Sequence, residues 1–133
     1  MPGIMQAGKT TIMKTIAKSI AIGNPADGFQ VVSAVKSTGG SGAAVEEDEI
    51  IAGIQLLAET EGIFAETAGG VTVAVLRKLL DAGTLDPDAE TVILNTGDGL
   101  KTLDAVAPVA SPTVTIAPRY GDFRAFADEK GLR

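Results

Sequence analysis

Residues 91–99 read Thr-Val-Ile-Leu-Asn-Thr-Gly-Asp-Gly, and this stretch decides which fold class we expect. Residues 91–95 are a largely apolar run that follows the turn at residues 86–88, and such a run predicts a strand buried on both faces. The strand leads into a glycine-rich turn, and open α/β sheets bind ligands at the carboxyl ends of their strands. The stretch therefore predicts an α/β fold with helices packed on a mostly parallel sheet.

The turn after this strand can be interpreted in two ways. Gly97 and Gly99 would let the backbone approach a flat ligand closely, and the hydroxyl of Thr96 could donate or accept one hydrogen bond. The same residues also suit an ordinary strand-to-helix turn, with Thr96 or Asp98 as the N-cap of the helix. Spacing alone does not choose between a ligand site and a cap.

Three helices are predicted before the strand. The first has Asn24 as its N-cap and Pro25 in its first turn, and it ends at Gly39. The second begins at the acidic residues 46–49, which favour the positive end of a helix dipole more than a cation site, and it ends at Gly62. The third is expected over residues 70–82, and its inward face would consist of Val71, Val75, Leu79 and Leu80.

The predicted elements do not complete a sheet. Residues 41–45 are a short strand or an extended link, and the segments after the glycine turn are a short helix over residues 100–105, an extended stretch over 113–116 and an amphipathic tail over 122–130. A lone central strand would leave its backbone N–H and C=O groups unpaired. We therefore expect the other strands of this sheet to lie elsewhere.

Composition excludes several function classes. The net charge of −6 argues against nucleic acid or an anionic membrane as partner, and no apolar run is long enough to span a bilayer. The chain has no Cys and no His, which removes thiolate nucleophiles, His-based triads and Cys/His metal sites. We expect a cytoplasmic protein without a metal.

Two further motifs have competing interpretations. Residues 3–10 match the phosphate-loop pattern, but only two residues precede it, so no strand can feed the loop and a tail is the better interpretation. Residues 66–70 read Glu-Thr-Ala-Gly-Gly. These small residues before a helix allow close approach either of a ligand or of another backbone, as in tight helix packing.

Three segments, residues 15–25, 61–70 and 94–101, together resemble threonine synthases, which are pyridoxal-phosphate enzymes of the tryptophan-synthase-β type. The resemblance implies the fold-type-II architecture, with the cofactor between two α/β domains. Residues 15–133 would be the C-terminal part of the large, cofactor-binding domain, and residues 1–14 a tail outside the family pattern. The implied reaction converts O-phosphohomoserine and water into threonine and phosphate.

The resemblance also implies site residues. Thr96 matches the position whose hydroxyl faces the pyridine nitrogen of pyridoxal phosphate. The other implied cofactor-binding residues are Gly97, Gly99, Glu66, Ala68 and Gly69. Gly23 and Asn24 match a loop on the substrate side of the active site.

The chain departs from the family pattern in two respects. None of its seven lysines matches the lysine that forms the Schiff base, and the glycine-rich loop for the cofactor phosphate is not in the matched region. We therefore assign no catalytic residue to this chain and expect it to be inactive alone. Its partner would be the missing N-terminal portion. The alternative is a catalytically inactive dimerisation or regulatory module that buries its sheet edge against a second copy.

Overall fold

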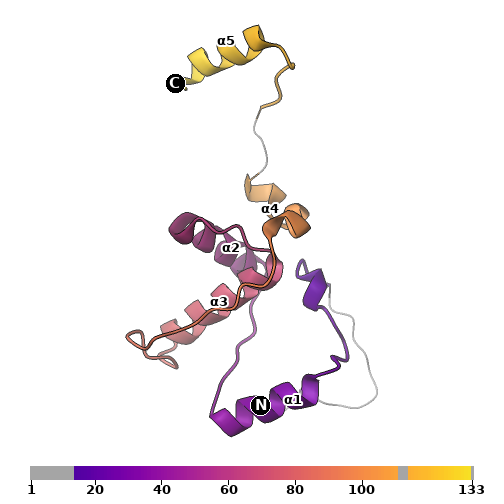
Figure 1. The fold of residues 1–133 in the computed structure, drawn as a ribbon, viewed down its shortest axis with the longest axis vertical. Helices are drawn as coiled ribbons and strands as arrows, with labels where there is room; N and C mark the ends of the chain where they lie inside the picture. Colours follow the sequence, from indigo (N-terminus) through magenta and orange to yellow (C-terminus); the bar gives the residue numbers. More distant parts are fainter. Residues whose placement is uncertain (1–13, 111–113, 133) are drawn as a thin grey trace.

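The computed structural model describes residues 14–110 and 114–132. The helices in these ranges are η1 (Lys18–Ile20), α1 (Gly28–Thr38), α2 (Glu47–Glu61), α3 (Thr67–Asp81), η2 (Gly99–Thr102), α4 (Leu103–Ala110) and α5 (Tyr120–Lys130) (Figure 1). The phosphate-loop pattern at residues 3–10 lies outside the described residues. Within them, no helix is long and apolar enough to cross a membrane.

Helix α2 has the boundaries that the sequence predicts. Glu46 and Glu49 form a reciprocal capping box at its start, in which the Glu49 carboxylate accepts a hydrogen bond of 2.7 Å from the backbone N–H of Glu46. The helix ends at Gly62, whose φ of 67° is in the left-handed region that glycine adopts easily. Ile50 and Ile54 are buried on its inner face.

Helix α3 begins three residues earlier than predicted, at Thr67. The backbone N–H of Thr67 donates to the hydroxyl of Thr102, so a residue distant in sequence satisfies one of the free donors of the first turn. The predicted inward face was also displaced. Val73 and Ala74 are the buried apolar residues, whereas Val71, Val75, Leu79 and Leu80 are only half-buried.

Helices α2 and α3 cross with their backbones in contact (Figure 1). A Cβ added to Gly53 would collide with the carbonyl oxygen of Gly70, and one added to Gly70 would lie 2.6 Å from the carbonyl oxygen of Ile50. Only glycine fits at such a crossing. A small core of Ala17, Ile50, Ile54 and Val106 forms beside it.

Helix α1 begins at Gly28, with Asp27 as its N-cap, so the prediction that Asn24 caps this helix was wrong. The end was predicted correctly, because Gly39 is the C-cap with φ of 68°. Apolar residues on α1 stay in solvent, and Phe29 is 76% exposed. A helix whose apolar face is exposed gains little stability from tertiary packing. The position at which α1 begins is therefore set by the local turn before it.

The predicted strand is extended but unpaired. Residues 91–96 have no secondary structure, residues 41–45 and 114–116 are likewise extended without strand pairing, and no strand occurs anywhere within residues 14–110 and 114–132. Val92 and Leu94 are 80% and 74% exposed, although their residue types are typical of a buried strand. The predicted mostly parallel sheet is therefore not confirmed, because a strand forms only where a neighbouring segment accepts its backbone hydrogen bonds.

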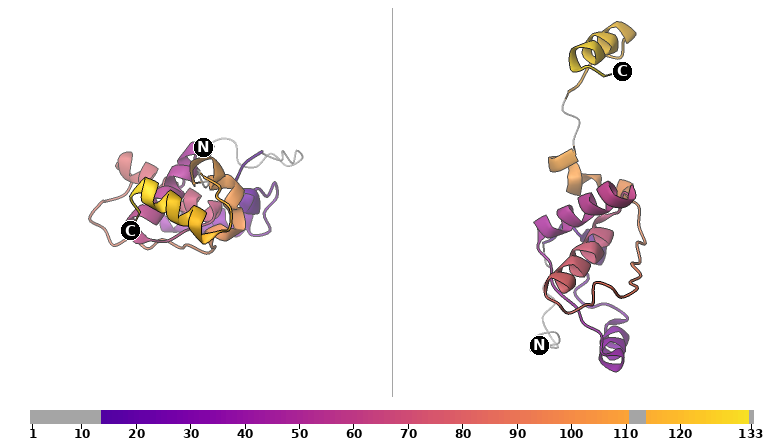
Figure 2. Two further views of the ribbon diagram at one scale, coloured as in Figure 1. Left: turned by 90° about the horizontal axis from the view of Figure 1, so that it is seen from above. Right: turned by 90° about the vertical axis from the view of Figure 1, so that its left-hand side faces the viewer.

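The C-terminal part follows the glycine turn. Helices η2 and α4 replace the single short helix predicted over residues 100–105, and α5 forms where the amphipathic tail was predicted. In Figure 1 and in the right-hand view of Figure 2, α5 lies apart from the crossing of α2 and α3. Its Tyr120 and Phe123 are exposed.

Candidate functional site

Two segments that the sequence analysis singled out separately lie against each other. Ala65 and Asp98 form an isolated antiparallel bridge. On either side of it, the backbone N–H of Glu66 donates to the carbonyl of Gly97 (3.1 Å), and the N–H of Gly99 donates to the carbonyl of Phe64 (2.9 Å). The glycine turn is thus clamped to the residues that lead into α3.

Glycine leaves the space that neighbouring side chains occupy at the contact points of this clamp. A Cβ on Gly97 would overlap the carboxylate of Glu66, and one on Gly99 would lie 2.6 Å from ring atoms of Phe64. A Cβ on Gly69 would lie 2.5 Å from the side-chain oxygen of Asn95. The two glycines of the turn therefore serve close packing between protein segments.

The start of η2 decides which residue caps the turn. The carboxylate of Asp98 accepts a hydrogen bond of 2.8 Å from the backbone N–H of Leu100, so Asp98 is the N-cap. Thr96 is left free of that role. It is exposed, and its hydroxyl has no protein partner within the part of the chain that the structure describes.

The turn borders an open cavity of about 420 Å³. Its lining residues come from the end of α2 and from the extended segment, and they are Gly62, Ile63, Phe64, Asn95, Thr96, Gly97 and Asp98. The volume lies in the range of small-molecule pockets. A free hydroxyl, two backbone segments and one aromatic ring converge on it.

Residues 66–70, the other segment with two interpretations, contact both the extended segment at Asn95 and helix α2. Gly69 makes room for Asn95, while Gly70 makes room for α2, so both interpretations of residues 66–70 apply at different positions. Ala68 is half-buried, and Glu66 is 7% exposed. Thr67 is completely buried, and its hydroxyl is the buried side-chain group without a hydrogen-bond partner among the described residues.

Gly23 and Asn24 are exposed, and within the described ranges no hydrogen bond or ion pair joins them to the glycine turn. Helix η1, which precedes them, contacts α3. The structure therefore packs η1 against α3 but leaves Gly23 and Asn24 outside the clamp.

Sequence reasoning missed an ion pair beside the turn. The ammonium of Lys101 lies 3.8 Å from the carboxylate of Glu66. The side chain of Glu66 is only 10% exposed, whereas that of Lys101 is 62% exposed. The two residues are 35 positions apart, so no local sequence pattern predicts that they pair. The pair is evident only once the clamp brings the two segments together.

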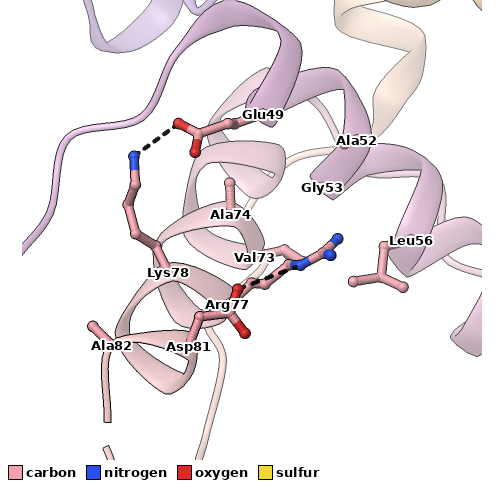
Figure 3. A pocket seen from close by; sticks show the side chains of 10 residues that line it. All are labelled: Glu49, Ala52, Gly53, Leu56, Val73, Ala74, Arg77, Lys78, Asp81 and Ala82. Atoms are coloured by element: carbon pink, nitrogen blue, oxygen red, sulfur yellow. Dashed lines mark hydrogen bonds and ion pairs between the residues drawn. The ribbon is translucent and has the colours of Figure 1, made fainter. Parts of the chain in front are cut away.

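A second hollow of about 530 Å³ lies between α2 and α3, away from the glycine turn (Figure 3). Its floor is made of small and apolar side chains, and two ion pairs lie at its rim, one between α2 and α3 and one along α3. Lys78 pairs with Glu49 at 2.9 Å, and Arg77 pairs with Asp81 at 3.8 Å (Figure 3). These pairs engage the four charged side chains that line the hollow.

Hydrogen bonds lower the pKa of carboxylates at the start of α2. For Glu49 the main cause is the backbone N–H of Glu46, followed by the ammonium of Lys78. For Glu47 it is the hydroxyl of Thr15, followed by the N–H of Ile16. Within residues 14–110 and 114–132, no group of three or more His, Cys, Asp or Glu residues could hold a metal ion.

Comparison with known proteins gives a family for the chain. Residues 1–97 match the family of pyridoxal-phosphate-dependent enzymes. The chain is 41% identical over 103 residues to a threonine synthase of Methanocaldococcus jannaschii, and the aligned region makes up 77% of the chain and 25% of that relative. It is 40% identical over 105 residues to one of Methanosarcina acetivorans (78% and 26%) and 38% identical over 115 residues to one of Halalkalibacterium halodurans (86% and 32%). The chain thus spans about a quarter to a third of the length of these curated relatives.

Proposed function

Because the chain belongs to the family of pyridoxal-phosphate-dependent enzymes, we propose that it is the C-terminal part of a threonine synthase. In the complete enzyme it would contribute to converting O-phosphohomoserine and water into threonine and phosphate. The observation that supports this proposal best is the clamp, because residues 64–66 and 97–99 resemble separate threonine synthase motifs and meet at one cavity.

The residues at this cavity fit one side of pyridoxal phosphate. A flat ring needs small residues beside it, and Gly97 lines the cavity. Gly99, Ala68 and Gly69 do not line it and would act through the clamp that holds the turn. The free hydroxyl of Thr96 is a neutral group that can hydrogen-bond to the pyridine nitrogen. In contrast to a carboxylate at that place, a hydroxyl does not favour protonation of the ring.

The chain's own contribution is to bind and orient. When bound, pyridoxal phosphate withdraws electrons from the carbon atoms of an amino-acid substrate. Thr96 would hold the ring nitrogen, and the clamp would keep Thr96 at one position. Gly23 and Asn24 would lie on the substrate side of the complete site, as in the resembling segment.

The covalent anchor for the cofactor would come from the complementary portion of the enzyme. Lys101, which lies beside the turn, is paired with Glu66, and Lys78 is paired with Glu49. Neither lysine lines the cavity at the glycine turn. We therefore expect the chain to have no activity alone and to act in the cytoplasm together with that portion.

A direct test is reconstitution with a polypeptide that carries the corresponding N-terminal portion of a threonine synthase. We expect stoichiometric binding of pyridoxal phosphate and release of phosphate from O-phosphohomoserine only when both polypeptides are present. Borohydride reduction followed by peptide mapping should place the cofactor on a lysine of the complementary polypeptide. Trapping at a single lysine of this chain alone would contradict the proposal.

Thr96 offers a sharper test within the reconstituted enzyme. Thr96→Ala should weaken cofactor binding by roughly two- to twelvefold, because one hydrogen bond contributes about 0.5–1.5 kcal/mol. Thr96→Ser keeps the hydroxyl and should bind as the parent does. Equal binding by both variants, measured by cofactor fluorescence titration, would remove Thr96 from the site.

A second candidate function is a dimerisation or regulatory module without catalysis. The exposed apolar side chains of the unpaired stretch, Val92 and Leu94, favour an association of some kind. A stable homodimer by sedimentation that does not bind the complementary portion would support this alternative.

A further inference from the structure

We propose that Glu66 is a positioning residue: its buried carboxylate, paired with Lys101, holds in place the turn that carries Thr96. The role of this turn toward the cofactor rests on the proposed function, whereas the clamp itself belongs to this chain.

The side chain of Glu66 is too buried to be freely available to a ligand. Its side chain is 10% exposed, and its carboxylate occupies the space where a Cβ of residue 97 would be. The carboxylate is thus directed at the protein backbone of the turn. The Glu66 carboxylate would therefore act on a ligand indirectly, by fixing the position of the turn.

A buried carboxylate is costly unless a cation or hydrogen-bond donors compensate it. Within the described residues, the ammonium of Lys101 is the cation within ion-pair distance of Glu66. Lys101 belongs to η2, which begins at the turn, while Glu66 precedes α3. The pair therefore joins the two sides of the clamp.

The backbone hydrogen bonds show what the pair holds. The N–H of Glu66 donates to Gly97, the neighbour of Thr96, and the N–H of Gly99 donates to Phe64. If the carboxylate left its place, the backbone of the turn would lose its side-chain support on one face. The position of the Thr96 hydroxyl depends on these two hydrogen bonds.

Amide hydrogen exchange of the 15N-labelled chain tests this proposal without any cofactor. Glu66→Gln keeps the shape and removes the charge, and Lys101→Met removes the cation from an exposed position, where the chain tolerates change. We expect each variant to accelerate exchange at the Glu66 and Gly99 amides by about tenfold, while the Ile54 amide in α2 keeps its rate. Lys101→Arg should restore the parent rate.

The exposed ion pair of Lys18 with Asp104, at 2.6 Å, provides the matched control. Lys18→Met should leave exchange at Glu66 and Gly99 unchanged. Unaltered exchange in both Glu66→Gln and Lys101→Met would overturn the proposal, as would equal acceleration at Ile54, which indicates a general loss of stability. If reconstitution gives no cofactor binding, the proposed function fails, yet the exchange rates still decide whether Glu66 holds the turn.

Discussion

At the residue scale, Gly97 is a position where the neighbouring side chain restricts the size of the residue. Its hydrogen atom faces the Glu66 carboxylate, and any larger group would displace that buried charge. The sequence indicated glycine here for approach to a ligand. In the structure the same glycine makes room for a neighbouring protein segment.

Gly97→Ala should therefore destabilise the chain by roughly 1–3 kcal/mol, the usual cost of forcing extra volume into a packed contact. Gly42→Ala is the matched control, because no atom lies within 4 Å of a Cβ at Gly42. Urea unfolding of both variants gives the comparison. Equal midpoints for the two would show that Glu66 moves aside without cost.

At the element scale, the crossing of α2 and α3 depends on two glycines in helices, where glycine is otherwise unfavourable. Gly53 and Gly70 face each other, and the space they leave lets the buried Ile50 and Ile54 contact α3. Sequence patterning found both helices, but the glycines inside them gave no indication of which partner they face.

Gly70→Ala should destabilise the helix pair by roughly 1–3 kcal/mol or more, since the added Cβ would meet backbone that cannot rotate away. Gly121→Ala, in α5, is the control, because a Cβ there meets no atom within 4 Å. That substitution should be neutral or slightly stabilising through helix propensity. Thermal unfolding followed by circular dichroism distinguishes the two outcomes, and similar losses in both variants would contradict the crossing.

The start of α2 should be sensitive to acid. The folded pKa of Glu49 lies below its usual value of 4.5, so its hydrogen bonds stabilise the fold above about pH 4.5, and that stability is lost as pH falls through the lower folded value. Glu49→Gln should reduce the loss of stability between neutral pH and pH 3. Glu59→Gln, exposed on the same helix, should leave it as in the parent. Urea unfolding at several pH values measures the difference, and identical pH profiles for the two variants would contradict the assignment.

At the scale of the whole molecule, the apolar side chains outside the core are more informative than those inside it. The core cluster beside the helix crossing consists of Ala17, Ile50, Ile54 and Val106, while Val92, Leu94 and Phe29 are among the large apolar side chains left in solvent. Under the proposed function, the complementary portion of a threonine synthase would cover these surfaces.

Val92→Asp separates stability from association. Val92 is 80% exposed, so the change should alter the unfolding free energy of the chain by less than about 0.5 kcal/mol. It should nevertheless abolish assembly with the complementary portion, because a charge would enter a buried strand. Analytical ultracentrifugation of the mixed polypeptides gives the result, with Glu90→Gln, an exposed neighbour, as control. Normal assembly of Val92→Asp would show that this stretch stays at the surface.

Local sequence determined the ends of the helices. Gly39 and Gly62 end α1 and α2 because their left-handed backbone needs no partner beyond the same helix, and the acidic start of α2 is explained by its own dipole and capping box. The three motifs of the resemblance also gave the family before any contact was known. These features act over a few residues, so a single sequence is enough to identify them.

Only the tertiary structure decided how the site is assembled. It showed that Asp98 and not Thr96 caps the turn, that Thr67 begins α3, and that Glu66 meets Lys101 across 35 residues. It also left residues 91–95 unpaired, although their composition predicts a strand. The Asp98 cap is a local hydrogen bond to Leu100, and the sequence left it open because Thr96 and Asp98 are both suitable cap residues. The start of α3, the Glu66–Lys101 pair and the unpaired residues 91–95 depend on which distant segment supplies a hydrogen bond or fills a space, and residue type alone does not specify that partner.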